Sequence, residues 1–233
     1  MASSPLPTRI DSNPLSAVVE LRFDSTKGPI EEYKDLLSHS FPKHSIKPTL
    51  VNGAIDENNP THVFANDNYH ISVNKKALSF ENIGDYQLWG NYFELIQNVL
   101  GKVFETKKIL HVDRIGVRYT TIFGNASSIS EALNVKIEFP LSGFKQSSTL
   151  CRKELNRKDI CININVGEGV QAVSRNRVLN GILVDIDAYT NSTFDTSIRK
   201  DIFDKIDELH TQEKQIFFQL LNPDFLTKLN PIY

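Results

Sequence analysis

The sequence has no long apolar run, no marked excess of one charge and only two cysteines. Its apolar stretches fall short of the ~20 residues that cross a bilayer, so no membrane-spanning helix is predicted. Lys and Arg number 26 against 28 Asp and Glu, a formal net charge of −2. A protein that coats nucleic acid needs a strong basic excess, so only a local basic patch stays possible. The absence of a charged-then-apolar leader predicts a cytoplasmic protein.

The two cysteines, Cys151 and Cys161, are too few for a disulfide framework and lack the paired ligands of a zinc site. They flank Glu154–Lys158, ELNRK, which has the composition of a hairpin turn. In a cytoplasmic chain they are expected to be two free thiols.

Sequence motifs for catalysis are also missing. There is no G-x-S-x-G, no P-loop and no G-x-G-x-x-G, and none of the six histidines has the spacing of a zincin or a deaminase. We therefore predict no catalytic residue, no cofactor and no metal site.

Hydrophobic periodicity predicts ten strands and four helices in a chain of 233 residues with ordinary globular composition. The predicted strands are Ala17–Phe23, Ile46–Val51, His62–Ala65, Tyr69–Val73, Ala77–Glu81, Leu110–Tyr119, Val135–Phe139, Ser147–Leu155, Ile160–Val166 and Gly181–Tyr189. The predicted helices are Ile30–Ser40, Asp85–Lys107, Ser128–Leu133 and Phe194–Leu221, and Ile55–Pro60 is expected to be a polar loop.

The order of these elements predicts an α+β protein of two similar halves, 15–108 and 109–233, fused in one domain after a flexible segment 1–14. Each half reads strand, short helix, antiparallel strands, long helix. The strands should form a curved antiparallel sheet with both long helices on one face. This element order resembles the TATA-binding-protein-like saddle, an analogy that says little about function.

The main strands carry polar side chains on their second face, as expected when helices cover only one side of a sheet. The candidate residues on this face are Glu20, Arg22, Arg114, Arg118, Asn163, Asp185 and Asp187. Gly116 separates Arg114 from Arg118 and should leave that face open. Two interpretations compete: cross-strand ion pairs on a solvated face, or a concave groove that binds a polar ligand. Mixed-sign faces are common in antiparallel sheets, which favours ion pairing.

A second candidate surface is a basic patch near a predicted hairpin. Its residues are Arg152, Lys153, Arg157, Lys158, Arg175 and Arg177, which would either contact phosphate or stand as solvated turn residues. A third idea is that Asp185 and Asp187 hold a divalent metal in a nuclease. The neighbouring strands lack the Glu-x-Lys expected of such a core, which weakens this alternative.

Three segments resemble a known family. They are Asn13-Pro14-Leu15 followed by VVELRF, the central DRIGVRY, and the ending FFQLLNPDFLTKLNP. Together they are similar to a sporadically distributed prokaryotic family of uncharacterised proteins of about this length. The resemblance implies no established enzymatic activity. Patchy distribution is typical of defence and toxin–antitoxin genes, so it implies an accessory or regulatory component of such a system.

We therefore expect a non-enzymatic binding or regulatory protein that acts through a protein partner or a second copy of itself. A nucleic-acid-binding protein that uses the arginine-bearing sheet face is one alternative. A metal-dependent nuclease is the other.

Overall fold

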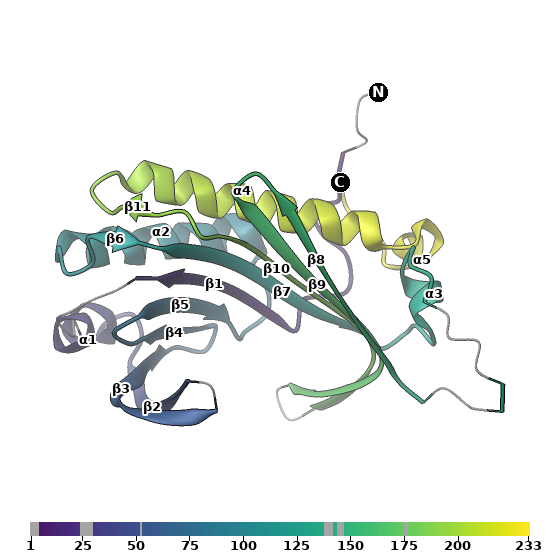
Figure 1. Cartoon of the computed structure of the whole chain (residues 1–233), viewed down its shortest axis with the longest axis horizontal. Coiled ribbons are helices and arrows are strands. Elements are labelled where there is room, and N and C mark those ends of the chain that lie inside the picture. Colours follow the sequence, from purple (N-terminus) through teal and green to yellow (C-terminus); the bar gives the residue numbers. More distant parts are fainter. Residues whose placement is uncertain (1–4, 24–29, 52, 138–141, 144–146, 175–176) are drawn as a thin grey trace. The chain divides into compact units, whose positions relative to one another are not determined.

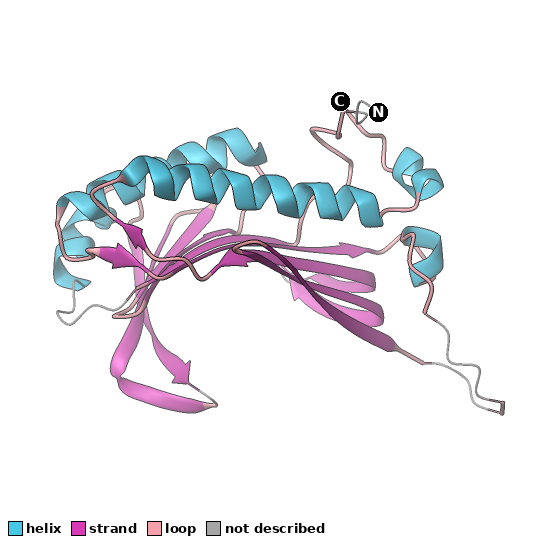
Figure 2. Ribbon diagram, turned by 45° about the horizontal axis from the view of Figure 1, so that its top comes forward, coloured by secondary structure: helices cyan, strands magenta, loops and turns pink. Residues whose placement is uncertain are grey.

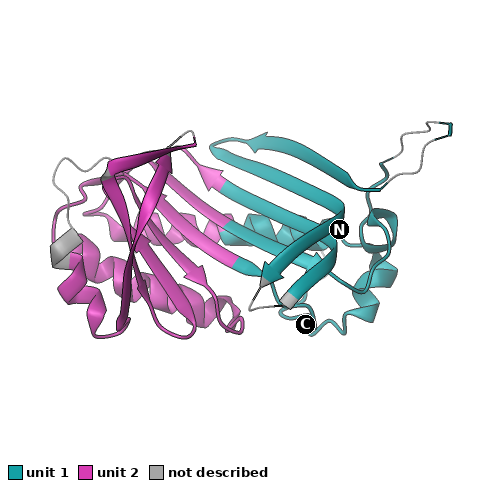
Figure 3. Ribbon diagram, turned by 90° about the horizontal axis from the view of Figure 1, so that it is seen from below, with its two compact units in different colours: residues 1–16, 118–188, 210–233 teal, residues 17–117, 189–209 magenta. Residues whose placement is uncertain are grey.

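The computed structural model describes residues 5–23, 30–51, 53–137, 142–143, 147–174 and 177–233. The fold is α+β, with a large antiparallel sheet and a few helices, some of them long. The chain forms two compact units (Figure 3): unit 1 holds 1–16, 118–188 and 210–233, and unit 2 holds 17–117 and 189–209. Each unit gathers segments distant in sequence. The two similar halves and the saddle stay predictions.

Unit 2 contains most of the N-terminal elements. In chain order these are β1 (Ser16–Arg22), α1 (Ile30–Ser38), β2 (Lys43–Val51), β3 (Ala54–Ala65), β4 (Tyr69–Val73), β5 (Ala77–Asn82), α2 (Leu88–Glu105), β6 (His111–Val112), the start of β7 (Arg114–Phe123), β11 (Phe194–Asp195) and the first half of α4 (Arg199–Leu220). Its main strands pair in the order β2-β3-β4-β5-β1-β7. β6 and β11 form a separate antiparallel pair.

Alternation along β1 decides which face of unit 2 is covered. Ala17, Val19 and Leu21 are buried while Glu20 and Arg22 lie on the opposite face, as predicted. The helices of unit 2 lie on the buried face (Figures 1 and 2). The fully buried Tyr92 fixes α2 there, because its hydroxyl lies within hydrogen-bond distance of the carbonyl oxygens of Ala17 at 3.1 Å and Phe80 at 2.7 Å.

Unit 1 contains the remaining elements. These are the rest of β7, α3 (Ile129–Ala132), β8 (Thr149–Arg157), β9 (Ile160–Ser174), most of β10 (Arg177–Thr190), the second half of α4 and α5 (Pro223–Lys228). The strands pair in the order β7-β10-β9-β8. Phe123 of β7 anchors the helical side, with ring centroids 6.2 Å from Phe217 of α4 and 5.2 Å from Phe225 of α5.

Residues 8–11 of the N-terminal segment are hydrogen-bonded to the C-terminal residues of the chain. The amide of Thr8 donates to the carbonyl of Ile232 at 2.6 Å, and the amide of Asp11 donates to the carbonyl of Leu229 at 2.9 Å. Ile10 between them is buried. Residues 8–11 thus contact the last residues of the chain, which are partners that sequence periodicity does not reveal. The flexibility of segment 1–14 stays a prediction.

Four other local expectations were wrong. Ile55–Pro60 belongs to β3, whose polar residues lie in an exposed hairpin with β2 that has no apolar stripe to reveal it. Glu154–Arg157 extends β8, and the turn falls at Lys158-Asp159, where Lys158 has φ 56°. The predicted strand Leu110–Tyr119 breaks at Asp113, because β6 pairs with β11. The C-terminal helix begins at Arg199, after β11.

Val135–Ile137 forms no strand, and the rest of that predicted element, 138–139, lies outside the described residues. β2, which contains Pro48, is the terminal strand in the order, and its register shifts between Lys47 and Thr49. One other expectation, the two free thiols, is confirmed. Both cysteines are free, since Cys151 lies opposite Val166 and Cys161 opposite Asn156.

Candidate binding surfaces

The Asp185 carboxylate is the centre of a polar cluster in unit 1. Arg118 on β7 donates from Nε to Oδ1 at 2.7 Å and from Nη2 to Oδ2 at 2.9 Å, a bidentate pair. The Thr120 hydroxyl donates to Oδ1 at 2.8 Å, and the Asn165 amide of β9 donates to Oδ2 at 2.9 Å. The Asp185 side chain is only 6% exposed, whereas that of Arg118 is 55% exposed.

The four donated hydrogen bonds satisfy this carboxylate fully. Burial alone would raise the pKa of Asp185, but the hydrogen bonds from Arg118, Thr120 and Asn165 outweigh it and hold the pKa below its ordinary value. Both oxygens already accept two hydrogen bonds, which is about the capacity of an ionised carboxylate. In this arrangement Asp185 has no lone pair left for a metal ion, which argues against the nuclease interpretation.

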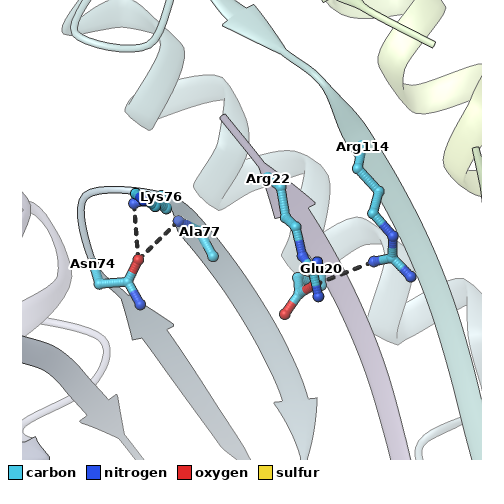
Figure 4. Close-up of polar contacts among 6 residues, drawn as sticks. All are labelled: Glu20, Arg22, Asn74, Lys76, Ala77 and Arg114. Carbon is cyan, nitrogen blue, oxygen red and sulfur yellow. Dashed lines mark hydrogen bonds and ion pairs between the residues drawn. The ribbon is translucent and has the colours of Figure 1, made fainter. Parts of the chain in front are cut away.

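The second cluster of the predicted sheet face lies in unit 2 (Figure 4). Glu20 accepts from Arg22 on the same strand at 2.7 Å and from Arg114 on β7 at 3.2 Å. The Arg114 guanidinium also lies 4.4 Å from the ring centroid of Tyr189, in cation–π geometry. A Cβ at Gly116 would come within 2.9 Å of this guanidinium, so the glycine makes room for Arg114 rather than leaving the face open.

The predicted face therefore separates into two clusters. The other two predicted residues are half-buried: Asn163 lies on β9 opposite Glu154, and Asp187 lies on β10 two residues after Asp185. Thr120 and Asn165 complete the Asp185 cluster and were missed as site residues, because short polar side chains on a strand carry no distinctive sequence signal.

The predicted basic patch lies mainly on the β8–β9 hairpin of unit 1. Its described members Arg152, Lys153, Arg157 and Lys158 are exposed, and Arg152 pairs with Glu154 at 2.5 Å. Arg177 is the first residue of β10, and Arg175 lies outside the described residues. The hairpin thus brings four basic side chains to one exposed strand and its turn.

Unit 2 also holds a pocket of about 390 Å³ between α1 and α2. Its lining is mostly apolar with a few polar side chains, and consists of Leu36, Leu37, Ser40, Phe41, Leu95, Asn98, Val99 and Lys102. The volume lies within the usual range for small-molecule sites, but no group of converging polar side chains among these lining residues defines a ligand.

Three ionisable residues of α4 are buried or half-buried in unit 1: His210, Glu213 and Lys214. His210 and Glu213 are buried, and the His210 ring lies 5.8 Å from that of Tyr119. Burial lowers the pKa of His210 to about 3, and Lys214 contributes to the same effect. Burial raises the pKa of Glu213 well above 4.5, because it disfavours the charged carboxylate.

Replacing Glu213 by glutamine is expected to stabilise the protein above pH 7, by about 1 kcal/mol. A folded pKa above the unfolded value makes Glu213 progressively destabilising as pH rises from about 4.5. Near pH 4 the two proteins should unfold at equal urea concentrations, because both side chains are then largely neutral. An equal difference at pH 4 and pH 8 would show that the effect is packing rather than titration.

No family model matches the chain, and no curated protein matches it significantly. Among the described residues, no helix combines the length and the apolar character that a membrane crossing requires.

Proposed function

We propose that this is a cytoplasmic binding protein that receives an extended acidic segment of a protein partner along β8. The observation that carries the proposal is the position of β8. Among the described residues it ends the strand order and pairs only with β9, and seven of its nine residues are exposed. An exposed edge strand is a template for the addition of another strand.

The register of the hairpin identifies the backbone groups that would bind. Arg157 and Ile160 close a two-residue turn, so their pair exchanges hydrogen bonds and every second pair along the ladder does the same. The amide and carbonyl groups of the intervening residues point away from β9. On β8 these residues are Leu150, Arg152, Glu154 and Asn156.

The side chains of the strand favour an acidic partner. β8 and its turn carry four basic residues against two acidic ones, Glu154 and Asp159, and Glu154 already pairs with Arg152. Like charges placed opposite each other disfavour pairing of β8 with a second copy of itself. The apolar side chains of Leu150, 72% exposed, and Leu155, 38% exposed, lie on opposite faces of β8, so an added strand meets apolar contact area beside basic side chains on either face.

The family resemblance adds a biological setting to the proposal. An accessory protein of a prokaryotic defence or toxin–antitoxin system acts on another component of that system, and the acidic segment would belong to that component. The sheet-face arginines give less support to nucleic-acid binding, because Arg114 contacts Glu20 and Arg118 contacts Asp185.

The test uses a peptide as long as β8 that alternates glutamate with valine or threonine, measured by fluorescence anisotropy against the whole protein. Glu154→Pro removes an outward amide but leaves the β8–β9 ladder, since proline is tolerated where the amide faces solvent. Glu154→Thr removes the same charge and keeps the amide. We expect Glu154→Thr to bind at least as tightly as the native protein and Glu154→Pro to bind at least tenfold more weakly.

The variants separate strand addition from charge attraction, because both make the edge more basic. Equal binding by Glu154→Pro and Glu154→Thr, both confirmed as folded by circular dichroism, would overturn strand addition. A single-stranded oligonucleotide that binds more tightly than the peptide, with a steep loss in salt, would favour the nucleic-acid alternative instead.

A further inference from the structure

Two histidines far apart in sequence meet on the edge of unit 2. In the β2–β3 ladder His44 lies opposite Phe64 and Ile46 lies opposite His62, so the two imidazoles are diagonal neighbours on one face. The distance from His44 Nε2 to His62 Nδ1 is 3.2 Å. His44 is exposed and also stacks on Phe64, with ring centroids 4.7 Å apart, while His62 is half-buried.

This distance suits two ligands of one metal ion. Zinc binds histidine nitrogen at about 2.0–2.1 Å, which puts two nitrogens of the same ion roughly 2.8–3.4 Å apart at right-angled or tetrahedral geometry. If both rings are neutral, with the proton of His44 on Nδ1 and that of His62 on Nε2, then His44 Nε2 and His62 Nδ1 can both donate a lone pair to the ion. Metal binding would then break the present hydrogen bond, and the ring that donates it would move its proton to its other nitrogen.

We propose that His44 and His62 form an exchangeable site for a divalent transition metal ion, of the zinc, nickel or copper class that imidazole prefers. The remaining coordination positions would hold water, because the described residues contain no group of three or more histidine, cysteine, aspartate or glutamate ligands. The ion would join β2 to β3 in the part of their ladder where β3 also pairs with β4. The site does not depend on the function proposed for β8.

The electrostatic setting allows binding but limits its strength. Lys34 of α1 interacts electrostatically with His62. The positive charge of Lys34 opposes a cation at the same place. We therefore expect micromolar rather than nanomolar affinity.

The experiment titrates zinc chloride and nickel chloride into the whole protein, with calorimetry for stoichiometry and imidazole NMR signals to locate the ion. The native protein should bind one equivalent, with both the His44 and His62 signals shifted or broadened. His44→Gln and His62→Gln should each weaken binding at least tenfold. His111→Gln removes an exposed histidine of the same unit and should bind as the native protein does.

The proposal fails if His44→Gln binds the metal as tightly as the native protein. It also fails if His111→Gln loses as much affinity as His44→Gln and His62→Gln do. It fails equally if no binding is measured at millimolar metal. Thermal unfolding of each variant without metal checks that the hairpin is intact, and a His44→Cys variant that restores zinc binding with a thiolate ligand would support the geometry independently.

Discussion

Replacing Asp185 by asparagine is expected to lower the free energy of unfolding by about 2–3 kcal/mol at pH 7. Asparagine keeps the shape but loses the charge that holds the Arg118 fork, and its amide nitrogen cannot accept from Asn165 or Thr120. The pKa of Asp185 lies below 3.8, so its ionised form stabilises the fold above that value and this contribution is lost as pH falls through the folded pKa. Urea unfolding should therefore show a difference that shrinks below about pH 4.

Asp187→Asn is the matched control, because Asp187 is the next acidic residue on the same face of β10 and is half-buried rather than buried. Its effect should be less than half as large. Equal losses in the two variants would contradict the central role of Asp185. Stabilisation of the native protein, but not of Asp185→Asn, by a divalent cation would revive the nuclease interpretation.

The polar sheet face was predictable because side-chain alternation depends only on a strand being present. The contacts between side chains on that face were not predictable, because they depend on the register between strands distant in sequence. Arg118 and Asp185 are 67 residues apart, and Arg114 and Glu20 are 94 apart. Nothing in the local pattern says that the two arginines of one strand contact acids on opposite neighbouring strands, or that Gly116 accommodates Arg114.

The buried ionisable groups were harder to predict still. The apolar residues Ile202, Ile206 and Leu209 recur at helical spacing along α4, and all three are buried. Helical spacing continues the same stripe to His210 and Glu213, which hydrophobicity alone assigns to solvent. Likewise, His44 and His62 are 18 residues apart and meet only because β2 pairs with β3, a strand that includes Ile55–Pro60, which composition assigned to a loop.

Replacing His210 by glutamine is expected to make the protein markedly more resistant to acid. The folded pKa of about 3 lies below the ordinary 6.5, so the unfolded chain binds a proton that the native state refuses. Stability is therefore complete above pH 6.5 and falls as the pH is lowered toward 3. At pH 4 this difference corresponds to about 3 kcal/mol, which the His210→Gln protein would not lose. Glutamine has nearly the volume of histidine, so the two proteins should differ by only about 1 kcal/mol at pH 7.

Urea unfolding at pH 7, 5 and 4 measures this effect, with His111→Gln as the control because His111 is exposed on β6. The His111 variant shows what the loss of an exposed imidazole does to stability, and the His210 variant should gain on the native protein steadily below pH 6.5. Parallel curves for the native and His210→Gln proteins would mean that His210 titrates normally in the folded state. That result would place the origin of acid sensitivity in the Asp185 cluster instead, whose loss begins only below about pH 4.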